Sequence, residues 1–240
     1  MAGEATYKRI LLKLSGESFS TAEGLGIEPA RIAAAVDEAL PVVELGVQLA
    51  IVVGGGNFVR ARDLTDDPNI RRVSADYMGM LGTVINALGL RDTIEARGHS
   101  VRVMSALPLP AICESFNARR AVRHLEAGRV VVFAGGTGSP FFTTDTTAAL
   151  RAGEIDAELI VKATKVDGVY DCDPMIDPNA RMYERLTYQQ ALQQRLAVMD
   201  LAAFSLCRDN RIPIVVCRLD VPGNLARAAR GEKVGTIITE

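Results

Sequence analysis

The sequence of 240 residues has no tryptophan and only two histidines, His99 and His124. With so few imidazoles, we expect neither a histidine-ligated zinc site nor a nucleophile activated by histidine. The cysteines have no metal-ligand spacing, and we expect free thiols in a reducing compartment. They are Cys113, Cys172, Cys207 and Cys217.

Long apolar runs and an excess of basic charge are also missing. No run approaches the roughly 18–20 residues of a membrane span, and Met1–Arg9 has no apolar signal core, so we expect a soluble, cytoplasmic protein. The formal net charge is −2, which predicts no broad basic surface for nucleic acid or an anionic membrane. Lysines and arginines beside glycine turns are therefore better candidates for local phosphate ligands.

Apolar segments rich in β-branched residues alternate with helical patterns along the chain. The length and a hydrophobic content of 48% suit one α/β domain over residues 1–240. The alternation predicts a mainly parallel sheet with helices on both faces. The expected strands are Ile10–Leu14, Val47–Val53, Val101–Met104, Val130–Phe133, Leu159–Val161, Ile214–Val216 and Thr236–Thr239. The expected helices are Pro29–Leu45, Arg71–Arg97, Ala118–Glu126, Thr144–Arg151, Tyr188–Gln194, Leu201–Asn210 and Gly223–Arg230.

Three local features qualify this pattern. Pro41 lies inside the first expected helix and predicts a kink or an early end there. The segment Lys165–Arg185 is rich in Asp, Gly, Pro and Asn, which predicts a loop or hairpin at the sheet edge. The longest expected helix carries apolar residues spaced by three and four, which indicates either core packing or a subunit interface. These residues are Met78, Leu81, Ile85 and Leu88.

Three of the expected strands run into turns rich in glycine and hydroxyl groups. The turns are Lys13–Gly16, Gly54–Asn57 and Gly135–Asp145. In a parallel sheet such turns lie beyond the carboxyl ends of the strands, where ligands bind. A glycine turn between a strand and a helix aims backbone N–H groups at an anion, so three of them predict phosphates on both sides of a reacting centre. Neither the P-loop pattern nor Gly-x-Gly-x-x-Gly follows the first strand.

Basic side chains stand beside these turns. Lys13 closes the first strand, and Arg60 follows the triple glycine by about one helical turn. Lys162 and Lys165, with Thr164 between them, end another strand and could flank a transferring phosphoryl group. Phosphoryl transfer is catalysed mainly by positioning and by electrostatic stabilisation from lysine, arginine and Mg²⁺. The sequence therefore favours this reaction class.

Carboxylates would orient the lysines and the metal in such a site. Asp200 begins a helical pattern, where an aspartate is favoured as the N-cap, and both roles can hold at once. Asp76, inside the longest helix, is interpreted from the sequence alone as a solvated charge. If the acceptor is itself a phosphate, its oxygen is already anionic and no general base is required. The scarcity of histidine is compatible with that chemistry.

Five motifs resemble those of the bacterial uridylate (UMP) kinases, a branch of the amino acid kinase family. The likeness extends from Tyr7 to Glu240, and the motifs are Lys13–Glu17, Gly54–Asn57, Gly136–Asp145, Lys162–Tyr170 and Val198–Ala202. The resemblance implies a three-layer α/β/α sandwich around a mainly parallel open sheet. It also implies a transferase of pyrimidine nucleotide biosynthesis that moves the γ-phosphoryl group of Mg–ATP to UMP, giving UDP and ADP, with Mg²⁺ as the cofactor.

The resemblance also implies roles for individual residues. Lys13, Asp145 and Asp200 would be catalytic. ATP would contact Lys13, Leu14, Ser15, Gly16, Gly56, Arg60, Lys162, Thr164, Lys165, Tyr170 and Asp173. UMP would contact Gly55, Asp76, Thr137, Gly138, Ser139, Pro140, Phe141, Phe142, Thr143 and Thr144.

Regulation and assembly are implied by the same resemblance. The chain would form a homohexamer that GTP activates and UTP inhibits, with no nucleic acid or membrane as partner. The response to GTP would involve Glu23, Gly24, Leu25, Gly26, Arg91, Arg102 and Arg129.

Two alternative functions remain open at this point. A kinase of the same fold that phosphorylates a carboxylate or carbamate would need a carboxylate pocket in place of Phe141–Asp145. A nucleotide-binding regulatory or storage protein without catalysis predicts a missing lysine or aspartate, whereas Lys13, Asp145 and Asp200 are all present.

Overall fold

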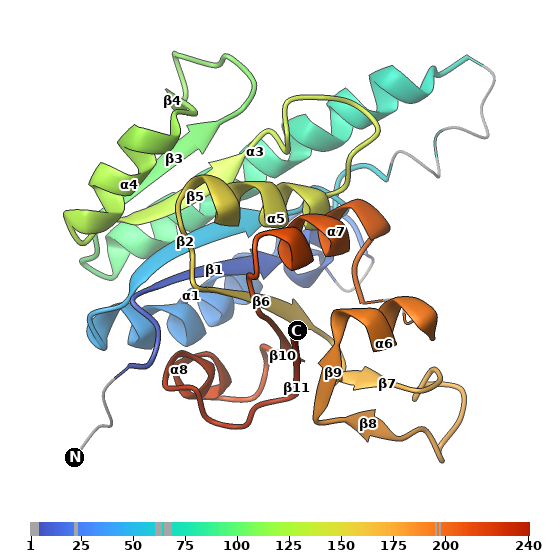
Figure 1. The fold of residues 1–240 in the computed structure, drawn as a ribbon. Coiled ribbons are helices and arrows are strands. Elements are labelled where there is room, and N and C mark those ends of the chain that lie inside the picture. Colours follow the sequence, from blue (N-terminus) through green and yellow to red (C-terminus); the bar gives the residue numbers. More distant parts are fainter. Residues whose placement is uncertain (1–4, 22–23, 61–63, 65–68, 195, 197) are drawn as a thin grey trace.

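The computed structural model describes the chain except residues 1–4, 22–23, 61–63, 65–68, 195 and 197 (Figure 1). Within the described residues one sheet contains β1 (Arg9–Leu14), β2 (Gln48–Val53), β3 (Val101–Ser105), β4 (Glu114–Ser115), β5 (Val130–Ala134), β6 (Leu159–Thr164), β9 (Arg185–Thr187), β10 (Ile214–Arg218) and β11 (Thr236–Thr239). A separate antiparallel hairpin is made of β7 (Val169–Tyr170) and β8 (Met182–Tyr183).

The helices alternate with these strands. A short 3-10 helix, Gly16–Phe19, follows β1. The α-helices are α1 (Pro29–Glu44), α3 (Arg72–Ala96), α4 (Ala118–Glu126), α5 (Thr144–Glu154), α6 (Tyr188–Gln193), α7 (Leu201–Asp209) and α8 (Asn224–Ala229). None of the helices in the described part of the chain combines the length and apolar character that a membrane crossing needs.

The sheet has the strand order β4-β3-β5-β2-β1-β6-β10-β11-β9. Neighbouring strands are parallel except for the antiparallel pair β10 and β11. Helices α1 and α8 cover one face, and α5 and α7 cover the other (Figure 1). The result is a sandwich of helices, sheet and helices, as the sequence predicts.

Alternation along β1 explains why both faces are covered. Ile10, Leu12 and Leu14 belong to the core beneath α1, whereas Leu11 belongs to the core beneath α5 and α7. Successive side chains of a strand point to opposite faces, so a strand buried on both faces is apolar almost throughout. Lys13 has the parity of Leu11 and therefore points toward α5.

The carboxyl ends of the central strands gather the glycine turns at one edge of the sheet. Leu14 of β1 pairs with Val53 of β2, so the two turns that follow these strands begin side by side. On the other side of β1, Lys13 pairs directly with Lys162 of β6. The chain thus places two lysines next to each other on the same face, at the point where the strand order reverses.

Most expected elements are confirmed within a few residues of their predicted ends. Pro41 does not end α1, because the helix continues to Glu44 and the Pro41 carbonyl accepts a hydrogen bond from the Leu45 N–H (3.3 Å). The segment predicted as a loop or hairpin does form the β7–β8 hairpin. The short strands β4 and β9 have no counterpart among the predicted strands.

The outer face of α3 tests the core-packing interpretation of its apolar residues. Met78, Leu81 and Ile85 are 42, 47 and 46% exposed, so the core-packing interpretation is wrong for these three. The core is instead contacted by the opposite face of the helix, through residues such as Ala87 and Leu90. α3 therefore carries an apolar stripe that nothing in the chain covers, within the described residues.

Candidate functional site

The centre of the candidate site is an aspartate between two lysines. Asp145, at the start of α5, lies 2.8 Å from the Lys13 ammonium and 2.7 Å from the Lys162 ammonium. All three side chains are largely buried, with exposed fractions of 11 to 15%. Lys162 also donates to the Val198 carbonyl. Two ammonium groups and one carboxylate leave a net positive charge, which suits an anionic ligand.

The pKa values of this cluster are shifted by burial and by neighbouring charge. Burial tends to raise the pKa of Asp145, but Lys13 and Lys162 outweigh it and hold that pKa below the ordinary 3.8. Burial lowers the pKa of Lys162 below 10.5, and the like charge of Lys13 adds to this effect against the attraction of Asp145. The carboxylate is therefore firmly ionised, while Lys162 gives up its proton more readily than an ordinary lysine.

Asp200 joins the ends of two helices beside this cluster. Its carboxylate accepts a hydrogen bond from the Ala203 N–H (2.9 Å), so it is the N-cap of α7, as the sequence predicts. It also accepts from the hydroxyl groups of Thr143 and Thr146. Thr143 in turn is the N-cap of α5 and accepts from the Asp145 N–H (3.1 Å). Asp200 thus acts on the central aspartate through the α5 terminus.

The glycine turn after β2 is packed against other backbone. A Cβ atom on Gly55 would lie 2.2 Å from the Gly79 carbonyl oxygen, and one on Gly16 would lie 2.6 Å from the Gly54 carbonyl oxygen. Larger residues at these positions would displace the main chain. This close approach explains the glycines without reference to flexibility, and it brings the turns after β1 and β2 together.

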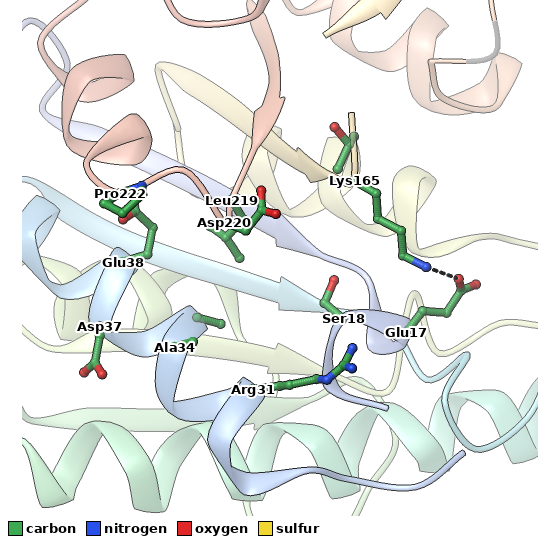
Figure 2. A pocket seen from close by; sticks show the side chains of 12 residues that line it. Glu17, Ser18, Arg31, Ala34, Asp37, Glu38, Lys165, Leu219, Asp220 and Pro222 are labelled. Atoms are coloured by element: carbon green, nitrogen blue, oxygen red, sulfur yellow. Dashed lines mark ion pairs between the residues drawn. The ribbon is translucent and has the colours of Figure 1, made fainter. Parts of the chain in front are cut away.

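Basic residues beside these turns are linked by Glu17. The Glu17 carboxylate pairs with Arg60 (2.7 Å) and with Lys165 (3.7 Å). Figure 2 shows the Glu17–Lys165 pair at the rim of a cavity of about 640 Å³ that α1 also lines, with Arg31 and Ala34. Lys165 is 78% exposed, so Lys162, not Lys165, belongs to the buried centre. The sequence alone did not separate these two lysines.

The segment predicted to contact UMP forms the turn between β5 and α5. Phe141 has a φ of 72°, in the left-handed region that is uncommon for a side chain of this size. Its N–H donates to the Asp76 carboxylate (2.8 Å), which also accepts from Arg72 (3.0 Å). Phe141 and Phe142 are both exposed. Asp76 is therefore not a solvated charge: it holds this turn, and the structure brings it to the predicted UMP segment.

The remaining residues predicted for ATP are more dispersed. Thr164 donates its hydroxyl to the Val166 carbonyl (2.6 Å) at the end of β6. Tyr170, in the hairpin, donates to Asp167 (3.5 Å), and Asp173 accepts from the Met175 N–H (2.9 Å) in an exposed loop. Thr164 ends β6, which lies on the opposite side of β1 from β2 and β5.

The residues predicted for the GTP response fall into three places. Arg91 and Arg102 line a cavity of about 640 Å³, and Arg129 lies outside it, paired with His124 Nδ1 (2.9 Å). Glu23 lies outside the described residues. Gly26 accepts from the Asn57 side chain (2.8 Å), which links the Gly24–Gly26 segment to the glycine turn after β2.

The donor set at the centre bears on the predicted Mg²⁺. In the described residues no group of three or more His, Cys, Asp or Glu side chains gathers as a metal site. Asp145 is occupied by two lysines, and Asp200 by hydroxyl and N–H donors. Mg²⁺ commonly uses one or two carboxylates together with waters and substrate phosphates. The residues present fit an ion that arrives with a nucleotide.

Sequence reasoning missed several polar residues that hold the site. They are Thr83, Asn86, Thr146 and Arg151, and all four are buried. None of them lies inside a recognised motif, although Thr146 directly follows the one that ends at Asp145. Asn57, also buried, ends the motif Gly54–Asn57, but no role was predicted for it.

Comparisons with known proteins agree with the geometry. Residues 8–218 match the family model described as the amino acid kinase family. The UMP kinase from Bacillus anthracis is 41% identical, with a TM-score of 0.93 over 97% of this chain and 96% of that one. The UMP kinase from Ureaplasma parvum is 34% identical, with a TM-score of 0.90 over 97% and 99%. The uridylate kinase from Archaeoglobus fulgidus is 30% identical, with a TM-score of 0.73 over 96% and 99%.

Proposed function

The chain belongs to the amino acid kinase family, and from that premise we propose that it transfers the γ-phosphoryl group of ATP to UMP, giving ADP and UDP. The observation that carries the proposal is the Lys13–Asp145–Lys162 cluster. It lies where β1 ends, between the turns predicted for the acceptor and the strand predicted for ATP. Solved UMP kinases at 41% and 34% identity over nearly the whole chain support the choice of acceptor.

The buried lysines explain how the reaction proceeds. The transferring phosphoryl group carries negative charge spread over its oxygens, and the largely buried Lys13 and Lys162 supply preorganised positive charge there. Asp145 holds both ammonium groups in place. The attacking oxygen belongs to the UMP phosphate and is already anionic, so no side chain needs to remove a proton.

We propose Mg²⁺ as the cofactor, bound with ATP. When bound, it would neutralise further phosphate charge. The residues available near it are Asp145 and Asp200, whose oxygens already accept from the chain, so the phosphates and water would supply most of the ligands. Lys13 and Lys162 orient the phosphates with or without the metal ion.

Asp76→Asn is expected to raise KM for UMP about tenfold or more and to change KM for ATP less than about threefold. The carboxylate holds the Phe141 N–H and is proposed to hold the UMP ribose, so its loss weakens acceptor binding. Initial rates with each substrate varied in turn give both constants. Equal increases in the two KM values would mean that Asp76 acts through folding or assembly.

The lowered pKa of Lys162 predicts an alkaline limb in kcat/KM. As the pH rises, Lys162 of the free enzyme loses its proton at a lower pH than an ordinary lysine, whose pKa is 10.5. The positive charge that attracts phosphate is lost with that proton. Lys162→Arg is expected to move the limb to higher pH, because a guanidinium stays charged. Lys165→Arg is the matched control, since this exposed lysine lies outside the cluster. An unmoved limb in Lys162→Arg would contradict the assignment.

The direct test of the proposed function is ADP formation from Mg–ATP with UMP, CMP, dUMP, AMP, acetylglutamate, aspartate and carbamate as acceptors. Strong preference for UMP is expected. Turnover with only a carboxylate or carbamate would leave the assigned fold unchanged and would replace UMP as the proposed acceptor. Nucleotide binding without turnover on any acceptor would indicate a regulatory or storage protein.

We also propose a homohexamer with GTP as activator and UTP as inhibitor. The apolar stripe on α3, with Met78, Leu81 and Ile85 exposed, supports a contact with a second copy. The cavity lined by Arg91 and Arg102 supports an anionic effector. Mass measurement in solution with and without each nucleotide, alongside rates, tests these proposals.

A further inference from the structure

Two polar side chains of α3 are buried on the side of the helix that faces the sheet. Thr83 is 4% exposed and Asn86 is fully buried. Burying a polar group costs free energy unless it is hydrogen-bonded, so the partners of these side chains indicate what they hold in place. Neither residue belongs to a recognised motif or to the charged centre.

Thr83 holds the turn after β5. Its hydroxyl accepts a hydrogen bond from the Gly135 N–H (2.7 Å) and donates to the Met80 carbonyl within the helix (2.6 Å). Gly135 and Gly136 have φ values of 74° and 58°, so the chain leaves β5 through two left-handed residues. The residues that follow are the segment proposed to wrap UMP. Thr83 therefore fixes the direction in which this segment starts.

Asn86 holds the turn after β2. Its amide donates to the Gly54 carbonyl (2.8 Å) and to Asn57 Oδ1 (2.7 Å). Asn57, which is also fully buried, donates back to Asn86 Oδ1 (3.0 Å) and to the Gly26 carbonyl (2.8 Å). This pair satisfies both amides inside the protein. It also ties α3 to the triple-glycine turn from a distance of about thirty residues in sequence.

The backbone of α3 makes the same connection by packing. A Cβ atom on Gly55 would lie 2.9 Å from the Thr83 nitrogen, and one on Gly82 would lie 3.1 Å from the Gly55 carbonyl oxygen. These contacts leave no room for a side chain between helix and turn. Since interiors are close-packed, a displacement of α3 would also move this turn.

We infer that Thr83 and Asn86 are positioning residues, which hold two turns in register from one helix: the turn after β5, proposed to wrap UMP, and the turn after β2, which carries Gly55 for UMP beside Gly56 for ATP. The inference rests on the proposed function. The strands that lead into these turns, β5 and β2, lie on one side of β1, whereas β6 lies on the other. Loss of either side-chain interaction should therefore affect the acceptor more than ATP.

The test compares Thr83→Val, which keeps the shape but removes the hydroxyl, with Thr83→Ser, which keeps the hydroxyl. Thr83→Val leaves the Gly135 N–H unpaired and is expected to raise KM for UMP roughly tenfold, with KM for ATP changed less than about twofold. Thr83→Ser is expected to stay within about threefold of the original protein for both substrates. Thr93→Val is the matched control, because the Thr93 hydroxyl donates within the same helix, to the Gly89 carbonyl (2.7 Å).

Asn86→Ala provides a second measurement, with the same preferential rise in KM for UMP. If that variant does not fold, the comparison of Thr83→Val with Thr83→Ser tests the inference. Equal changes in the KM values for UMP and ATP in Thr83→Val would overturn the inference. A rise in KM for UMP in Thr83→Ser as large as in Thr83→Val would also overturn it, and so would unchanged KM values with a lowered Tm. The original protein is assayed in parallel, because absence of UMP turnover there would refute the proposed function instead.

Discussion

Lys13→Ala is expected to lower kcat by about 10³-fold or more while the Kd for UMP changes less than about threefold. Lys13 lies 2.8 Å from Asp145 and is largely buried, so its charge is preorganised where phosphoryl charge develops. An interaction of that kind is stronger in the transition state than in the ground state, and its removal therefore lowers kcat. The acceptor turns are held by α3 and do not depend on Lys13.

Single-turnover rates and UMP titration by calorimetry measure the two quantities separately. Lys233→Ala is the matched control, because Lys233 is 92% exposed and pairs with Glu184 far from the centre. It is expected to leave both values unchanged. A near-normal kcat in Lys13→Ala would remove this lysine from the mechanism. Weakened UMP binding with unchanged kcat would make it an acceptor ligand instead.

Asp145→Asn is expected to damage both catalysis and stability. The substitution keeps the shape but leaves two buried ammonium groups without their counter-charge. Breaking a buried ion pair in this way costs roughly 3–5 kcal/mol of the free energy of unfolding. We also expect kcat to fall by at least about 10²-fold, because the lysines repel each other away from their positions.

Urea unfolding of Asp145→Asn, together with kcat, checks this prediction. Asp37→Asn is the control, because Asp37 also forms an ion pair, with Arg97, but its side chain is 59% exposed. An exposed pair contributes about 0–1 kcal/mol, so the control should be nearly neutral. Comparable losses of stability in the two variants would show that the buried Lys13–Asp145–Lys162 cluster contributes no more to stability than an exposed ion pair. A stable but inactive Asp145→Asn would limit Asp145 to catalysis.

The layered fold could be predicted from the sequence because its signals are local. β1 and β2 are apolar runs that end in glycine turns, and α4 has the predicted bounds, Ala118–Glu126. Strands such as β4 and β9, of two and three residues, are too short to carry a period and form only because a neighbour pairs with them. Their existence depends on tertiary structure.

The site divides in a similar way. Lys13, Asp145 and Asp200 could be predicted from motifs, but the direct pairing of Lys13 with Lys162 depends on the register between β1 and β6. Thr83 and Asn86 left no sequence signal, since a lone polar residue in a helix is usually solvated. Their partners lie 52 and 32 residues away, and such distances are set only by folding.

The pairing of the two lysines also determines which changes in chain length the protein can accept. Inserting one residue in β1 ahead of Leu12 would reverse the parity of the residues that follow, sending the ammonium toward the core beneath α1 and Leu12 toward Asp145. Inserting two would restore the face but displace the lysine by about 7 Å along the sheet. Point substitutions elsewhere in β1 can be absorbed by repacking, but length variation there cannot. Natural or engineered insertions are therefore expected in the surface loops and not between Arg9 and Lys13.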